Sequence, residues 1–161
     1  MLKGIKIFKN SIFKDHRGYI WTSWTGHKKK YKKLEFKHDK FTLSKKNVLR
    51  GFHWDNKTWK LISCIYGKMF FVVLNYNKRS KDFLKSKSFI LNARKNKQIL
   101  IPPYFANASL CPSNSCLMHY KLSYPDKYND VDKQNLVKWN DPRLKIKWPI
   151  KKNIILSKRD K

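Results

Sequence analysis

The stretch that decides the fold reads Asn47-Val48-Leu49-Arg50-Gly51-Phe52-His53-Trp54, and after two residues it continues as Lys57-Thr58-Trp59-Lys60-Leu61. The β-branched and aromatic residues of both runs predict two strands that follow each other along the chain. The same runs carry Arg50, His53 and Lys60. Buried strands rarely hold such charge unless an anionic or reacting group needs it. We therefore expect a β-rich protein with a functional site on these two strands.

Similar short runs, bounded by turn residues, recur along the whole chain, and Gly67-Lys68 between two of them is typical of a tight hairpin. No segment keeps a helical period over four turns, so only a few short helices fit, for example near Ser80–Leu84. This pattern predicts an all-β, closed or sandwiched antiparallel fold such as a jelly roll, which can hold one small ligand. The expected strands are Gly4–Phe8, Tyr19–Trp24, Leu34–Leu43, Val48–Trp54, Trp59–Tyr66, Lys68–Tyr76, Ser86–Leu91, Gln98–Ile101, Cys116–Tyr124 and Leu136–Trp139.

The length of 161 residues, with 41% hydrophobic residues, fits one globular domain spanning residues 1–161. The formal charge of +28 is typical of proteins that bind nucleic acid. However, Lys supplies 32 of the 38 basic residues and is spread along the chain, whereas Arg, which reads phosphates and bases bidentately, occurs six times. We therefore expect no nucleic-acid partner. The charge would still attract a small anionic substrate.

The cysteines and the N-terminus favour a reduced, cytoplasmic protein. The three cysteines show no Cys-x-x-Cys spacing, which argues against disulfides and zinc. The first ten residues lack the apolar core of a signal peptide, and no apolar run approaches a membrane span. A catalytic metal is also not expected, because the five histidines form no His-x-His pair and Glu35 is the only glutamate.

His53 is the strongest candidate for chemistry, although a packed core histidine is the commoner role for such a residue. The cations Arg50 and Lys60 would disfavour its charged form and leave a neutral imidazole, which is a general base. Such a base needs an orienting carboxylate. Asp141 follows an aromatic-flanked strand and could supply it, but it could equally cap an Asx-turn before Pro142. Strand alternation turns Tyr120 inward, either as core or as a proton donor facing His53.

Eight ordered blocks over nearly the whole chain carry a family resemblance. They are Phe13–Gly18, Ser44–His53, Lys60-Leu61 with Gly67, Gln98–Pro102, Tyr120-Lys121, Trp139–Pro142, Ile146–Pro149 and Leu156–Asp160. In these blocks the chain resembles the nucleoside-diphosphate 4-keto-6-deoxy-sugar 3,5-epimerases, a family of the cupin jelly-roll class typified by dTDP-4-dehydrorhamnose 3,5-epimerase.

The resemblance implies a role for each matching residue. It makes His53 the general base, Asp141 its orienting carboxylate and Tyr120 the general acid on the other face of the sugar. Lys60 would lie near the keto oxygen. Arg17 and Arg50 would contact the substrate, including its phosphates. The resemblance also implies a cofactor-free isomerase of deoxysugar and polysaccharide biosynthesis, usually a homodimer in which the partner chain completes one sheet.

The chain departs from the family pattern at several pocket positions. Asn107 stands where the family has a site histidine, His38-Asp39-Lys40 replaces a Gln-x-Asn motif, and Asp55 replaces a glutamine. The variant pattern resembles a subgroup that acts on GDP-linked 4-keto-6-deoxyheptoses in bacterial capsule synthesis. We therefore expect Asn107 and His38 to contact the substrate, and a dTDP- or GDP-linked sugar as partner.

Two alternatives stay open on the sequence alone. One keeps the fold and substrate class but inverts a single centre or isomerises the 3- and 4-positions. The other is a non-enzymatic, basic β-barrel that binds single-stranded nucleic acid through aromatic residues and lysines.

Overall fold

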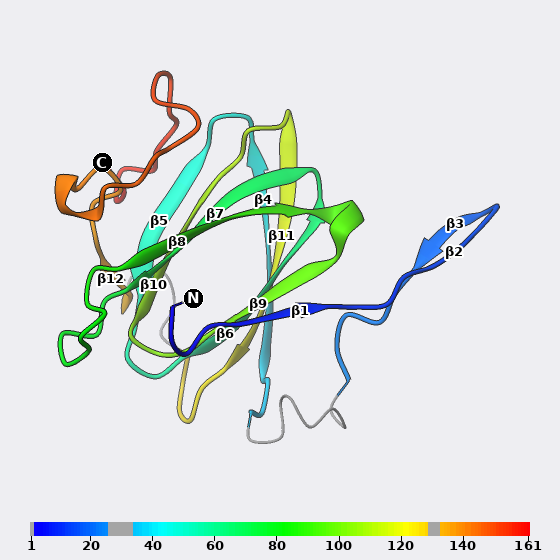
Figure 1. Ribbon diagram of the computed structural model, residues 1–161, viewed down its shortest axis with the longest axis horizontal. Coiled ribbons are helices and arrows are strands. Elements are labelled where there is room, and N and C mark those ends of the chain that lie inside the picture. Colours follow the sequence, from blue (N-terminus) through cyan, green and yellow to red (C-terminus); the bar gives the residue numbers. More distant parts are fainter. Residues whose placement is uncertain (1, 26–33, 129–132) are drawn as a thin grey trace.

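The computed structural model describes residues 2–25, 34–128 and 133–161, which fold almost entirely as antiparallel β-sheet (Figure 1). Two five-stranded sheets pack face to face, as the predicted jelly roll requires. In spatial order the first sheet contains β1 (Lys6–Lys9), β9 (Lys97–Ile101), β6 (Trp59–Tyr66), β11 (Ser115–Ser123) and β4 (His38–Lys45). The second contains β12 (Asn135–Leu136), β5 (Leu49–Trp54), β10 (Phe105–Leu110), β7 (Lys68–Asn75) and β8 (Ser86–Asn92).

A separate hairpin, formed by β2 (Phe13–Asp15) and β3 (Gly18–Ile20), projects away from the two sheets (Figure 1). Both of its strands are almost entirely exposed. The hairpin therefore contributes little to the core of its own chain.

The sequence prediction missed one strand of the barrel and misplaced a helix. β10 reads Phe-Ala-Asn-Ala-Ser-Leu, a composition with low strand propensity, yet all six residues are buried between β5 and β7. The helix expected near Ser80–Leu84 is a series of turns, because the side chains of Asn77 and Ser80 accept hydrogen bonds from nearby backbone N–H groups. Short 3₁₀ turns occur instead at Ala93–Lys95 and Pro142–Leu144.

The main core lies between the two sheets. Ile62 and Met118 of the first sheet pack with Phe71 and Val73 of the second, all at most 2% exposed. These residues follow the two-residue period of their strands, so each sheet turns one apolar face inward. The end of this interior near the β5–β6 turn is polar instead.

A second apolar cluster lies on the outer face of the second sheet, where the C-terminal segment covers it. Trp148 packs against Phe52 and Phe70, with ring centroids 6.1 and 5.5 Å apart. Ile155 then forms a parallel bridge with Val48, and its carbonyl accepts from the Leu49 N–H at 3.0 Å. The segment is thereby held along β5 as it returns toward the interior.

An extra residue in β5 brings Arg50 and His53 to the same side of the sheet. In a regular strand, residues three apart face opposite sides. Here Asn107 lies opposite His53 while Ser109 lies opposite Arg50, so β5 carries one more residue than β10 over this interval. Gly51 absorbs the bulge with a φ of +106°. A Cβ at this position would lie 2.4 Å from the backbone oxygen of Asn107.

The Gly51→Ala substitution tests this arrangement against Gly18→Ala in the exposed hairpin. Both glycines have positive φ, but a Cβ at Gly18 meets nothing within 4 Å. Both variants therefore suffer backbone strain, and only Gly51→Ala adds a steric clash. We expect Gly51→Ala to lower the free energy of unfolding by about 1–3 kcal/mol more than Gly18→Ala, measured by urea denaturation. Equal losses would show that the bulge has room for a side chain.

Candidate active site

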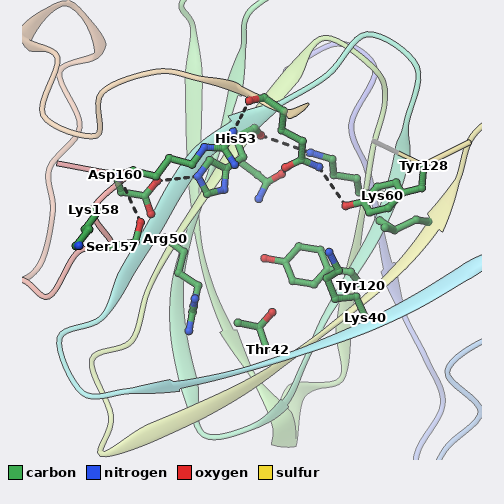
Figure 2. Close-up of a pocket in the computed structure, with 14 residues that line it drawn as sticks. Lys40, Thr42, Arg50, His53, Lys60, Tyr120, Tyr128, Ser157, Lys158 and Asp160 are labelled. Carbon is green, nitrogen blue, oxygen red and sulfur yellow. Dashed lines mark hydrogen bonds and ion pairs between the residues drawn. The ribbon is translucent and has the colours of Figure 1, made fainter. Parts of the chain in front are cut away.

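A cavity of about 410 Å³ opens between the two sheets and collects the polar residues of the interior (Figure 2). The first sheet contributes Lys40 and Thr42 from β4, Lys60 from β6 and Tyr120 from β11. The second contributes Arg50 and His53 from β5 and Asn107 from β10. The C-terminal residues 157–160 close one side. All seven of these strand residues carry groups that can hydrogen-bond to or react with a polar ligand.

His53 forms a dyad with Asp160. Its Nε2 lies 2.7 Å from the carboxylate Oδ1 of Asp160, which is only 4% exposed. A carboxylate accepts hydrogen bonds, so in the neutral imidazole Nε2 carries the proton and Nδ1 keeps its lone pair. His53 therefore has the tautomer of a general base, with Nδ1 as the atom that can take a proton.

Two further contacts fix the Asp160 carboxylate. Burial alone would raise its pKa, but hydrogen bonds from His53, from the backbone N–H of Gly51 and from the Ser157 turn lower the pKa below its usual value. The backbone N–H of Asp160 also donates to the Ser157 Oγ at 3.2 Å. Asp160 is thus ionised near neutral pH and rigidly held beside His53.

Lys60 presents its ammonium group from the first sheet. The side chain is 5% exposed, and its Nζ donates to the Asn107 Oδ1 at 3.1 Å and to the His53 carbonyl at 3.4 Å. Burial lowers the pKa of Lys60 from 10.5 to about 8. Below that pH the ammonium is a fixed positive charge in a site of low dielectric, where it acts strongly on a nearby anion.

Tyr120 points its hydroxyl into the cavity, toward the space between His53, Lys60 and Arg50 (Figure 2). Burial raises the pKa of its phenol well above the usual value, and the positive charge of Arg50 only partly opposes this. The phenol therefore stays protonated at physiological pH. Such a group can give a proton to a carbanion but does not compete with His53 as a base.

The cavity is strongly cationic. Within the part of the chain that the structure describes, Lys40, Arg50, Lys60, Lys158 and Arg159 line it together with a single acidic residue, Asp160. Arg50 is held in place by hydrogen bonds to the Ser44 hydroxyl, at 3.1 Å, and to the Leu43 carbonyl, at 3.3 Å. A preformed cluster of this kind fits a phosphorylated ligand.

The prediction that Asp141 orients His53 is wrong, because Asp160 occupies that position. Asp141 caps the 3₁₀ turn Pro142–Leu144, accepting from the Arg143 backbone N–H at 3.0 Å, and pairs with the Arg143 guanidinium at 2.6 Å. These hydrogen bonds lower the pKa of Asp141. The Asx-turn, which the residues equally allowed, is therefore its role.

The remaining predicted residues divide into two groups. His53, Lys60, Tyr120, Arg50 and Asn107 line the cavity together, as predicted. Arg17 does not reach it: it lies on the projecting hairpin and pairs with Asp15. His38 belongs to the inward row of β4 but does not line the cavity; its ring packs at a tilt against Tyr128, with centroids 5.0 Å apart, and Tyr128 lines the cavity.

Several lining residues escaped the sequence analysis, notably Asp160, Lys40, Gln134 and Arg159. Asp160 lies within the last of the matching blocks, and acidic residues are scarce in this chain. These two features could have marked it as a candidate partner of His53. Choosing it over Asp141 required knowledge of where the C-terminal segment packs. Among the described residues no three His, Cys, Asp or Glu side chains are grouped to hold a metal, and no helix is long and apolar enough to cross a bilayer.

Comparison with known proteins identifies the family of the chain. A family model described as dTDP-4-dehydrorhamnose 3,5-epimerase matches residues 1–161. The chain belongs to this family of isomerases. The Salmonella typhimurium enzyme of that name is 30% identical over 162 residues, which cover 97% of this chain and 87% of that one. The Escherichia coli enzyme is 30% identical over 166 residues, covering 99% and 88%.

Solved structures give the same result for the fold. The epimerase from Legionella pneumophila, in complex with dTDP-4-keto-L-rhamnose, superposes with a TM-score of 0.89 at 29% identity, covering 97% of this chain and 84% of that chain. The Bacillus anthracis enzyme with TDP and pyrophosphate gives 0.88 at 27% identity, covering 98% and 91%. The predicted fold and the predicted epimerase class are confirmed, and the non-enzymatic alternative is not favoured. The absence of a cofactor and of a metal stays a prediction.

The two aspartates provide a matched pair of variants. We expect Asp160→Asn to lower epimerase kcat by about 10²–10⁴-fold, because a neutral amide stabilises a protonated imidazole poorly and its NH₂ group can turn toward Nε2 and favour the wrong tautomer. Asp141→Asn removes an ion pair outside the cavity and should keep kcat within a few-fold. Steady-state kinetics of both purified variants, with circular dichroism to check folding, decide the point. A large loss in Asp141→Asn with full activity in Asp160→Asn would reverse the assignment.

Proposed function

We propose that this protein epimerises a nucleoside-diphosphate-linked 4-keto-6-deoxy sugar, acting as one domain of residues 1–161. The observation that carries the proposal is the meeting of three groups in one cavity: the His53–Asp160 dyad, the Lys60 ammonium and the Tyr120 phenol. Lys60 carries the positive charge and Tyr120 the proton that carbanion chemistry requires, and the Asp160 carboxylate fixes the tautomer of the neutral His53 ring. Relatives crystallised with dTDP-sugar, or with TDP and pyrophosphate, support a substrate of this class.

The chemistry follows from the 4-keto group, which acidifies the C–H bonds at C3 and C5. His53 Nδ1 removes one of these protons, and the electron pair moves into an enolate whose negative charge gathers on the C4 oxygen. Lys60 stabilises that oxygen. Tyr120 returns a proton to the opposite face of the carbon, which inverts the centre. Asp160 keeps the protonated imidazole oriented until its proton is lost.

The cationic side chains of the cavity other than Lys60 could bind the diphosphate of the substrate. Arg50, Lys158 and Arg159 lie on the side of the cavity formed by β5 and the C-terminal segment. Charge-assisted hydrogen bonds from such groups would hold the diphosphate and position the sugar ring between His53 and Tyr120. Two of the departures from the family pattern, Asn107 and Lys40, line the cavity. The sugar we propose is linked to dTDP or GDP: the relatives with bound ligand support dTDP, and the departures at pocket positions motivate testing GDP.

Deuterium exchange tests the proposal directly. The protein is incubated in D₂O with dTDP- and GDP-linked 4-keto-6-deoxy sugars, and the products are analysed by NMR and mass spectrometry. We expect solvent deuterium at C3, C5 or both for at least one sugar. Two exchanged sites would indicate a 3,5-epimerase, and one site a single-centre epimerase. Absence of exchange in every sugar of the panel would refute the function.

Two variants separate the acid from the base in the same assay. His53→Ala should slow exchange by about 10²–10⁴-fold, because no other group takes the proton. Tyr120→Phe should still exchange deuterium but return it to the original face, so that exchange outruns inversion. Undiminished exchange in His53→Ala would remove that residue from the mechanism.

We also propose that the protein works as a homodimer through the outer face of the first sheet. Leu117 of β11 lies directly opposite Leu43 on one side and Tyr66 on the other, and Leu43 and Tyr66 are more than 60% exposed. Phe41, equally exposed, continues this row and stacks on His119. So large an apolar strip on a highly charged protein fits an interface. A partner in this position could bring the projecting Arg17 to the cavity of the other chain.

The oligomeric state is measured by size-exclusion chromatography with light scattering. We expect a dimer of twice 19.4 kDa for the wild type and a monomer for Leu43→Lys, whose charge would be buried in the interface. Ile90→Lys is the control, because Ile90 is comparably exposed, at 51%, on the second sheet. A wild-type monomer, or a dimer that survives Leu43→Lys and dissociates with Ile90→Lys, would contradict this surface.

A further inference from the structure

Lys60 is held by neutral hydrogen-bond acceptors. Its ammonium donates to the Asn107 Oδ1 and to the His53 carbonyl, and it has no direct ion pair within the described residues. Because lysine has donors only, the atom of Asn107 that faces it must be the oxygen. Asn107 therefore ties Lys60 of the first sheet to β10 of the second, directly opposite His53.

A neutral partner has an electrostatic consequence that a carboxylate would not have. An oxygen dipole satisfies a hydrogen of the ammonium but leaves its full positive charge to act elsewhere in the cavity. A carboxylate in contact would hold the ammonium more tightly and cancel most of its field at any second anion. Asn107 thus fixes the position of the charge without neutralising it.

The charged groups around Lys60 act from a distance and in opposite directions. Asp55, at the end of β5, favours the ammonium, and its buried Oδ2 has no hydrogen-bond partner in the described chain. Lys40 of β4 disfavours the ammonium. The other titratable groups of the cavity are His53 with Asp160, Tyr120, Tyr128 and Arg50, with Lys158 and Arg159 on the C-terminal side. Asn107 is the side chain in direct contact.

We propose that Asn107 is a positioning residue for catalysis, whose side-chain oxygen holds the Lys60 ammonium, charged and uncompensated, where the enolate oxygen forms. This inference rests on the proposed function for its catalytic part. The hydrogen bond itself favours the charged form of Lys60, since an acceptor stabilises an ammonium more than a neutral amine. Removing the acceptor therefore makes the proton of Lys60 easier to lose, and replacing it with a carboxylate makes the proton harder to lose.

Two variants of nearly the same shape as asparagine test the proposal in opposite directions. In Asn107→Leu the acceptor is lost, so the pKa of Lys60 should fall below its present value of about 8. In Asn107→Asp the neighbouring negative charge should raise it. The titration is followed by NMR of protein labelled with ¹³C at lysine Cε, and Lys60→Met identifies the signal. This measurement does not depend on any substrate.

The pH profile of deuterium exchange then tests the catalytic part. The basic limb of kcat/KM reports loss of the ammonium, so it should move to lower pH in Asn107→Leu and to higher pH in Asn107→Asp. Both variants should be slower at their optimum, by about 10–100-fold, the first because Lys60 is misplaced and the second because its field is cancelled. A residue that merely supports the fold would slow the enzyme without moving the limb in opposite directions.

The outcomes are distinct. Opposite shifts of both the Lys60 signal and the basic limb support the proposal, and an unchanged Lys60 titration in the two variants overturns it. The proposal is also overturned if the pKa of the Lys60 signal shifts while the basic limb of kcat/KM stays in place. Lys60 would then be coupled to Asn107 without taking part in the reaction. If no sugar of the panel reacts, the proposed function fails while the NMR still decides the coupling. Should Asn107→Leu fail to fold, Asn107→Ala carries the same expected direction.

Discussion

The hydrogen bond between Asp160 and His53 is the contact on which the site depends. It joins a residue of a central strand to a residue of the irregular C-terminal segment. His53 lies on a central strand, while Asp160 is the penultimate residue of the chain and belongs to no strand. The carboxylate reaches the imidazole only because Trp148 and Ile155 first hold the C-terminal segment against the outer face of the second sheet and along β5. Packing on one face of a sheet therefore sets the tautomer of a base on the other face.

The bulge at Gly51 is the second requirement, and it serves the same dyad. It turns Arg50 and His53 to one side, and the Gly51 N–H, although distant at 3.5 Å, also points at the Asp160 carboxylate. One glycine thus shapes the strand and contributes to the environment of the orienting acid. Within Arg50-Gly51-Phe52-His53 the glycine thus allows Arg50 and His53 to face the cavity, while Phe52 packs on the outer face against Trp148.

The fold could largely be predicted from sequence because most of its strands show a clear two-residue alternation of apolar and polar residues. β6 was predicted with its exact bounds, whereas β10 was missed because Ala, Asn and Ser lack the bulk that marks a strand, even though burial by neighbours decides its structure. The site residues divide in the same way, into those on regular strands and those on irregular segments. Residues on regular strands, such as Lys60 and Tyr120, could be placed by alternation, while Asp160 could not, since its position depends on packing of an irregular segment.

The cavity concentrates positive charge beyond what the overall excess of lysine explains. Most of the +28 charge lies on solvated surface, where water screens it at little cost. Lys60 is different, because burying an ammonium without a carboxylate in contact opposes folding, as its lowered pKa shows. In the proposed mechanism, an anion that forms beside Lys60 supplies the missing partner. That anion is the oxygen of the enolate, which is present only while the proposed reaction takes place.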